Sequence, residues 1–292
     1  MLASDILKKI RKIEITTKSL VSDIFSGEYH SIFKGQGLEF SEVREYQDGD
    51  AFRQIDWNVS ARMGRPFIKK FEETRELNVL FLIDGSYSTL FGTKDSLKSE
   101  YITEIAAILS FSALSNNDKV GLLLFTDNVE KYIPPRKGRK SALRLLREIL
   151  YFEPKGKATD FNRVLEYVYQ LTKKRSIIFL ISDFLDSDYD FPLKLLSKKH
   201  DVIAIQILDR AEIELPKAGI IDMYDAETGT TFLVNTSRKK IYKKYKEIQY
   251  QNQQKLLKNF KKMNIDMINL VTDEPYIASL TKFFKKRIGR RR

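Results

Sequence analysis

Asp84, Ser86 and Ser88 follow the first strongly apolar run of the sequence, residues 78–83 (NVLFLI). A continuous apolar run of this length is typical of a strand that is buried on both faces of a parallel sheet. An aspartate and two hydroxyls on the loop after this strand can present three oxygen atoms to one small cation, and Mg²⁺ prefers oxygen ligands in octahedral geometry. The same residues also fit an ordinary turn in which a serine caps the next helix.

Two further oxygen-bearing side chains occur at predicted strand-to-helix junctions. Thr159 lies in a loop before a helix, within residues 156–160 (GKATD), and Asp183 follows a second fully apolar strand, residues 176–182 (SIIFLIS). Open α/β sheets bind their ligands at the carboxyl ends of the strands, where such junctions meet. We therefore expect the following residues to converge on one metal site: Asp84, Ser86, Ser88, Thr159 and Asp183.

The composition restricts the chemistry of such a site. The sequence has no cysteine and two histidines, His30 and His200, which excludes disulfides, thiolate ligands and a multi-histidine metal centre. Both histidines are expected to be structural. A metal held by oxygen alone is expected to be Mg²⁺, with Mn²⁺ or Ca²⁺ as alternatives, rather than Zn²⁺.

From residue 77 onward, apolar runs alternate with helical patterns. Strands that alternate with helices over this length predict an α/β fold with a doubly wound, mostly parallel sheet. A glycine-containing turn also predicts a hairpin of residues 220–224 and 230–234. The expected strands are 78–83, 119–125, 176–182, 201–208 and 265–271, with 129–133 at an edge, and the expected helices are 94–115, 141–150, 160–171, 191–196, 237–262 and 275–286.

The N-terminal quarter of the chain differs in character from the rest. Residues 4–25 have the apolar spacing of a helix, whereas residues 28–75 contain several glycines and short mixed runs that indicate turns and short strands. We therefore expect a small helix-plus-strand subdomain at 1–76. The α/β domain is expected at 77–292, with the hairpin inserted near 212–235 and basic helices at the C-terminus.

Charged residues of both signs crowd residues 35–62, where Arg44, Arg53 and Arg62 lie among six acidic residues. The simpler interpretation is an ion-pair network that fixes the subdomain onto the sheet, with Trp57 as part of the core. The alternative is a surface on which a partner docks.

The five predicted ligands resemble the metal-ion-dependent adhesion site of von Willebrand A domains. That site has the pattern Asp-x-Ser-x-Ser, followed by a loop threonine and a strand-end aspartate, and all five positions match. The resemblance implies that Ser86 and Ser88 bind the metal directly, Thr159 directly or through water, and Asp84 and Asp183 mainly through water. It also implies that a carboxylate of an acidic partner or client protein completes the coordination.

A second set of residues is spread over most of the chain: GQGLEF at 35–40, VREY at 43–46, Gly49, Asp50, Arg53, IDW at 55–57, SAR at 60–62, VGLLLF at 120–125, PPR at 134–136, SDF at 182–184 and DAETG at 225–229. With these residues nearly the whole chain is similar to a narrower group, the MoxR-associated von Willebrand A-like proteins (domain of unknown function 58). Ala51 and Thr74 depart from the pattern, which usually has acidic residues there, but neither belongs to the metal site. This resemblance implies a MoxR-type AAA+ ATPase as partner, with the chain acting as an adaptor or co-chaperone in maturing or metal-loading a client complex.

The net charge of +12 resides in the C-terminal segment, because residues 238–292 hold 17 basic and 4 acidic residues. The simpler interpretation is the solvated side of lysine-rich helices. The alternative is a surface that binds nucleic acid, an anionic membrane or an acidic protein.

A hydrolase is a lesser alternative, because an aspartate after a strand can be a phosphatase nucleophile. That chemistry needs a second aspartate at position 86, which is Ser86, and no phosphate-binding loop or nucleophile elbow follows a strand. We therefore expect a protein-interaction module and not an enzyme. No apolar run reaches the roughly 18 residues of a membrane-spanning helix, and the N-terminus does not resemble a signal peptide, so the expected location is the cytoplasm.

Overall fold

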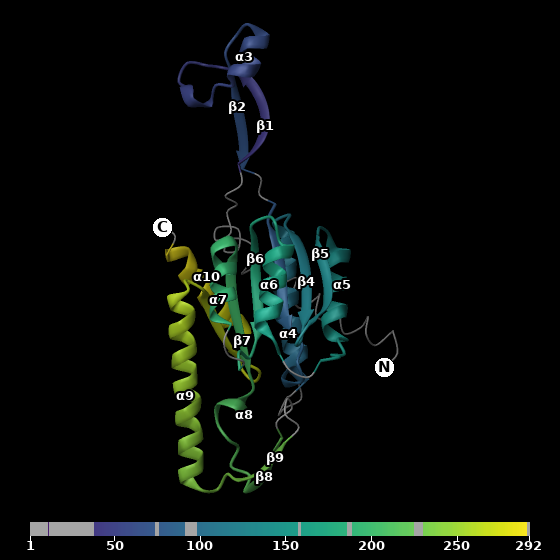
Figure 1. The fold of residues 1–292 in the computed structure, drawn as a ribbon, viewed down its shortest axis with the longest axis vertical. Coiled ribbons are helices and arrows are strands. Elements are labelled where there is room, and N and C mark those ends of the chain that lie inside the picture. The colour runs from purple at the N-terminus through teal and green to yellow at the C-terminus, as the bar shows by residue number, and fades with distance from the viewer. Residues whose placement is uncertain are drawn as a thin grey trace. The chain divides into compact units, whose positions relative to one another are not determined.

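The chain folds into two compact units, of which one is Phe33–Glu76 and the other contains Leu77–Arg292. The helix predicted at 4–25 lies outside the described residues apart from Arg11. The computed structural model (Figure 1) describes residues 11, 38–73, 76–90, 98–156, 159–185, 189–224 and 230–290.

A six-stranded sheet forms the centre of the larger unit, with the strand order β10-β7-β6-β3-β4-β5. Strand β5 is antiparallel to β4, and the other neighbouring strands are parallel. The chain enters at β3, builds outward to β5, and then returns to β6 on the other side of β3, so the sheet is doubly wound with its switch point between β3 and β6. The strands are β3 (Asn78–Asp84), β4 (Lys119–Phe125), β5 (Val129–Arg136), β6 (Ser176–Ser182), β7 (Asp201–Leu208) and β10 (Asp266–Val271).

Helices cover both faces of this sheet. On one face, α6, α7 and the C-terminal part of α9 pack against alternate strand residues such as Leu80 and Leu82, and Figure 1 shows α6 and α7 on its near side. On the other face α4 packs against α5, and Tyr101 of α4 meets Tyr276 of α10 edge to face. The predicted α/β fold with a doubly wound, mostly parallel sheet is confirmed. The helices are η3 (Tyr87–Leu90), α4 (Lys98–Ser115), α5 (Arg139–Leu150), α6 (Phe161–Leu171), α7 (Asp190–Lys199), α8 (Arg210–Ile213), α9 (Lys239–Lys262) and α10 (Tyr276–Arg290).

The central strands are apolar on both faces because both faces are covered. Every residue of β6 is buried, and the rings of Phe81 on β3 and Phe179 on β6 stack with centroids 5.5 Å apart. Each fully buried side chain of this size contributes roughly 1.5–3 kcal/mol. The core therefore holds the carboxyl ends of β3 and β6 in a fixed position relative to each other.

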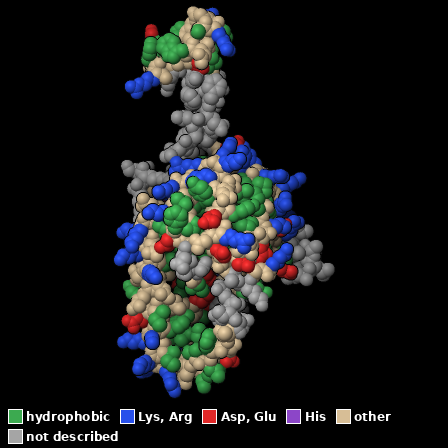
Figure 2. Space-filling view, viewed as in Figure 1, with side chains coloured by type: hydrophobic (Ala, Val, Ile, Leu, Met, Phe, Trp, Pro, Cys, Tyr) green, Lys and Arg blue, Asp and Glu red, His purple; other side chains and the backbone are tan. Residues whose placement is uncertain are grey.

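The predicted hairpin is present as β8 (Ile220–Tyr224) and β9 (Thr231–Asn235), and the long helix α9 follows it. Near the start of α9, the Tyr245 hydroxyl donates to the carbonyls of Ala211 and Glu212 at 3.3 and 3.2 Å. Near its end, Phe260 is buried in the core. All nine lysines of α9 are exposed, and Figure 2 shows blue side chains along the side where Figure 1 has α9.

The smaller unit is an antiparallel pair, β1 (Leu38–Glu45) and β2 (Phe67–Glu73), with two short helices between the strands. The sequence predicted only turns and short strands here, so the helix α3 (Trp57–Met63) and the 3₁₀ turn η2 (Phe52–Gln54) correct that prediction. The capping signals of α3 are present in the sequence, but the helix is short. The Asp56 side chain accepts from two backbone amides, and Gly64 ends the helix with a φ of 68°.

An expected ion pair of Arg44 forms in this unit, and a further pair involves Arg65, which lies outside residues 35–62. Arg44 donates to both carboxylate oxygens of Asp50, at 2.7 and 2.9 Å, and Arg65 pairs with Glu45 at 2.6 Å. The expectation that Trp57 fills a core is wrong, because its side chain is 61% exposed.

His200 is a buried residue that joins the start of β6 to α6. Its Nδ1 accepts from the Ser176 amide at 3.2 Å, and its Nε2 lies 2.9 Å from the Thr172 hydroxyl. An Nδ1 that accepts a hydrogen bond must be unprotonated, so the ring is neutral. Burial, followed by the charges of Lys199 and Arg175, lowers the pKa of His200 to about 4.

We expect the stability that His200 contributes to be present above pH 6.5 and to be lost as the pH falls from 6.5 toward about 4. In this window the unfolded state binds the proton and the folded state does not. The variant His200→Gln keeps an acceptor for the Ser176 amide but has no group that titrates. As the pH falls from 6.5 toward about 4, its urea midpoint of unfolding should therefore fall less than that of the wild type. Asp84, whose pKa is raised to about 6, makes both proteins more stable as the pH falls through the same window. The quantity to compare is therefore the difference between the wild-type and variant curves of urea midpoint against pH. Parallel curves between pH 4 and 7 would contradict the assignment.

Candidate metal site

The predicted ligands converge at the switch point of the sheet. Asp84 is the last residue of β3, and Asp183 directly follows β6, which is paired in parallel with β3. Both carboxylates are buried, with exposures of 1% and 5%. Parallel strands end at the same edge of a sheet, which is why two residues far apart in sequence meet there.

Asp84 is the centre of the hydrogen-bond network at this edge. Its Oδ1 accepts from the Ser86 amide at 2.9 Å, and its Oδ2 accepts from the Ser182 hydroxyl at 2.7 Å. The Thr159 hydroxyl approaches both oxygens, at 3.4 and 3.5 Å. Asp84, Ser86 and Thr159 thus belong to one hydrogen-bonded cluster. Ser88 is the fourth of the five predicted residues in this cluster.

Ser88 joins the cluster through Ser86, since their hydroxyl oxygens are 3.0 Å apart. The turn that brings them together is closed by Thr89, whose amide and hydroxyl both donate to the Ser86 carbonyl, at 3.0 and 2.7 Å. Gly85 lies against the ring of Phe152, and a Cβ at this position would come within 2.1 Å of the ring and force it to move.

Glu130 on β5 holds residues 155 and 156, which precede Thr159 in the sequence. Its carboxylate accepts from the amides of Lys155 and Gly156 and from the Thr126 hydroxyl at 2.7 Å. These contacts hold residues 155 and 156 near the end of β4.

Two buried carboxylates at one sheet edge repel each other. Burial, followed by the negative charge of Asp183, raises the pKa of Asp84 to about 6. Bringing a cation to this position would relieve both the burial cost and the repulsion.

The structure adds three polar residues that sequence reasoning did not assign to the site: Ser182, Lys98 and Glu212. Lys98 on α4 is 1% exposed, and its ammonium lies 3.5 Å from Asp183 Oδ2 and 2.6 Å from Glu212 Oε1. The other Glu212 oxygen accepts from the Asp209 amide at 2.7 Å, and burial is the main cause that raises the pKa of Glu212.

A sequence signal for Lys98 exists. It lies four and seven residues before Ile102 and Ile105 on α4, so helical periodicity places this lysine on the same face as these apolar residues. A lysine on such a face is seldom left without an acidic partner. Nothing in the sequence indicates that Glu212 is that partner.

The donor set fits a small oxygen-binding cation. Adjacent ligands of octahedral Mg²⁺ lie about 2.9 Å apart, given metal–oxygen distances of 2.0–2.1 Å, and the Ser86 and Ser88 hydroxyl oxygens are 3.0 Å apart. In the described part of the chain, no cluster of three or more histidine, cysteine or acidic side chains is arranged to hold a metal. The oxygen atoms available to a metal at this edge are the Ser86, Ser88 and Thr159 hydroxyls and the Asp84 and Asp183 carboxylates.

The sequence matches a protein family described as "Protein of unknown function DUF58" over residues 42–255. The chain belongs to this family. An uncharacterized protein of Mycobacterium tuberculosis is 26% identical over 283 residues, which cover 95% of this chain and 88% of that protein.

Solved structures give more distant similarities. A conserved hypothetical protein, BatB from Bacteroides thetaiotaomicron, is 15% identical with a TM-score of 0.46 and covers 73% of this chain and 99% of that one. The VWA domain of SpRpn10 is 11% identical with a TM-score of 0.40 and covers 70% of this chain and 93% of that one.

Replacing Lys98 with methionine should lower the free energy of unfolding by about 3–5 kcal/mol, because Asp183 and Glu212 would lose a buried counter-charge. The double variant Lys98→Met/Glu212→Gln should recover part of that loss. Guanidinium unfolding in EDTA measures both, with the exposed Lys258→Met as control. A single variant within about 1 kcal/mol of the wild type would contradict the role given to Lys98.

Proposed function

We propose that this DUF58 family member is a Mg²⁺-dependent protein-interaction module and not an enzyme. The observation that carries the proposal is the convergence of Asp84, Ser86, Ser88, Thr159 and Asp183 at one sheet edge. Mn²⁺ and Ca²⁺ are alternative ions. The metal would supply a coordination position for a carboxylate of a partner protein.

The burial of the site supports this choice of ligand. Asp84, Ser86 and Asp183 are buried, whereas Ser88 and Thr159 are half-buried. A metal held here would therefore be approached from the side of Ser88 and Thr159, the more exposed ligands.

The partner we propose is a MoxR-type AAA+ ATPase, with an acidic client protein as the second. This part of the proposal rests on the sequence resemblance. The chain would act as an adaptor or co-chaperone in the cytoplasm, where the ATPase has ATP. Of the helices in the described part of the chain, none combines the length and hydropathy that crossing a bilayer requires.

The exposed lysines of α9 favour a second candidate, binding to nucleic acid or to another anionic surface. The nine lysines of this helix are accompanied by one acidic residue, Glu247. Their exposure agrees equally with a solvated helix face, so this candidate ranks below the metal-dependent interaction.

We expect the wild-type chain to bind one Mg²⁺ by isothermal titration calorimetry and Ser86→Ala to bind it at least tenfold more weakly, because a direct ligand is lost. The matched control is Ser110→Ala, a buried serine on α4 about 18 Å along the helix from Lys98. Circular dichroism checks that both variants fold. Equal Mg²⁺ affinity in all three proteins would refute the metal site.

We also expect the chain to bind the MoxR-type ATPase of the same genome in Mg²⁺, with Ser86→Ala weakening the complex at least tenfold and Ser110→Ala leaving it unchanged. The Mg²⁺ concentration stays constant because the ATPase itself needs the ion. Binding that survives Ser86→Ala but is lost in Lys243→Glu/Lys258→Glu, with a steep dependence on salt, would assign the interaction to α9 instead.

A further inference from the structure

A cavity of about 810 Å³ lies between α9 and the carboxyl ends of β7 and β10. It shares a wall with the candidate metal site, because Phe184 and Leu185 line it and directly follow Asp183. Gln206 also belongs to both, since it lines the cavity and its Nε2 donates to the Asp183 carbonyl at 2.8 Å. A molecule in the cavity would therefore border the metal.

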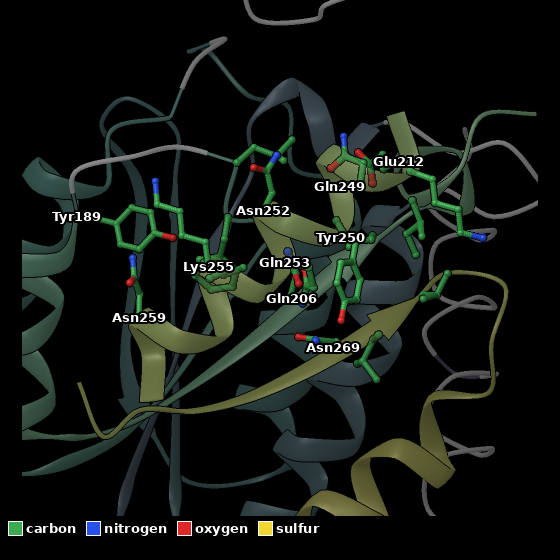
Figure 3. Close-up of a pocket in the computed structure, with 18 of the residues that line it drawn as sticks. Tyr189, Gln206, Glu212, Gln249, Tyr250, Asn252, Gln253, Lys255, Asn259 and Asn269 are labelled. Carbon is green, nitrogen blue, oxygen red and sulfur yellow. The ribbon is translucent and has the colours of Figure 1, made fainter. Parts of the chain in front are cut away.

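The lining of this cavity is unusually rich in carboxamides. Figure 3 shows them projecting from α9 on one side and from β7 and β10 on the other. A carboxamide carries two donors and an acceptor, which are the complements of the carbonyl and amide of a peptide group. The carboxamides are Gln206, Gln249, Asn252, Gln253, Asn259 and Asn269.

Two of these carboxamides hold buried atoms that lack a hydrogen-bond partner among the described residues: the acceptor Gln206 Oε1 and the donor Gln253 Nε2. Gln206 is 3% exposed. A buried polar atom without a hydrogen bond lowers stability by about 1–3 kcal/mol. Both atoms therefore favour a ligand that supplies the missing hydrogen bonds. An acceptor on β7 and a donor on α9, on opposite walls, match the amide of one residue and the carbonyl of its neighbour in an extended chain, because successive residues direct these groups to opposite sides.

The carboxamides on α9 form a row from Gln249 to Asn259 whose length also fits an extended polymer. Gln249 to Asn259 spans ten residues of α9, which is about 15 Å at 1.5 Å per residue. An extended peptide covers this distance with about four or five residues at roughly 3.3 Å each. The helix is anchored at its ends by Tyr245 and Phe260, so the row between them stays above the cavity.

The charges around the cavity are few and of both signs. Glu212 and Asp190 are acidic, whereas Lys246 and Lys255 are basic, and Lys246 is paired with Glu214 at 3.1 Å. This arrangement does not favour a polyanion such as a nucleic acid strand or a triphosphate. It suits a neutral, hydrogen-bonding backbone with apolar side chains that reach Leu256.

We propose that this carboxamide-lined cavity binds an extended segment of a partner protein through main-chain hydrogen bonds, alongside the metal site. The inference rests on the proposed function for the nature of the occupant, a protein. Main-chain hydrogen bonds supply affinity for many sequences, while side-chain positions along the segment supply specificity.

The test uses random 12-residue peptides selected by display on the full chain in EDTA, so that no metal contributes. We expect selected peptides to bind at least tenfold more weakly to Gln253→Met and to Asn269→Thr, which remove carboxamides from opposite walls. Gln254→Met is the matched control, because Gln254 is exposed on the same helix and does not line the cavity. Fluorescence anisotropy measures each affinity.

Failure to select any peptide, or peptides that bind Gln253→Met as well as wild type, would overturn the inference. So would adenosine or ATP binding that depends on Gln253 in place of peptide binding. Ser86→Ala separates the two proposals, because peptide binding in EDTA should not change in this variant. If Mg²⁺-dependent partner binding is lost in Ser86→Ala and kept in Gln253→Met, the metal function stands and the cavity inference fails.

Discussion

The repulsion between two buried carboxylates is the constraint on which the rest of the site depends. Asp84 and Asp183 end neighbouring parallel strands, and their mutual repulsion together with burial raises the pKa of Asp84 to about 6. The protein meets this cost with hydroxyl donors around Asp84 and with the Lys98 ammonium between Asp183 and Glu212. The cation that we propose beside Asp84, Ser86 and Ser88 would be the remaining counter-charge.

Packing and hydrogen bonds support the strands that carry these carboxylates. The stacked rings of Phe81 and Phe179 join β3 to β6, and Glu130 on β5 accepts from the amide of Gly156. At the metal site that we propose, selection between cations of different size would require a fixed ligand spacing.

The candidate metal site and the carboxamide-lined cavity complement each other as recognition elements. A metal would make one strong, directional contact with a carboxylate, whereas the carboxamides would form several hydrogen bonds along the main chain of an extended segment. Because Gln206 contacts the Asp183 carbonyl and also faces the cavity, a segment lying there would be aligned with the metal. Short weak contacts gain affinity when a neighbouring contact has already fixed the ligand.

The amino-acid pattern alone predicted the α/β fold, because uninterrupted apolar runs such as 78–83 and 176–182 have one stable environment, a sheet covered on both faces. It also predicted that Asp84 and Asp183 lie at one edge of the sheet, since both end strands that pair in parallel; that they hold a metal stays a prediction. It did not predict the short helix Trp57–Met63 or the exposure of Trp57, which depend on local packing. Lys98 and Glu212 are 114 residues apart, and the cavity lies between α9 and two strands. Contacts of this kind arise from how helices pack on the sheet, and local sequence patterns carry no record of that packing.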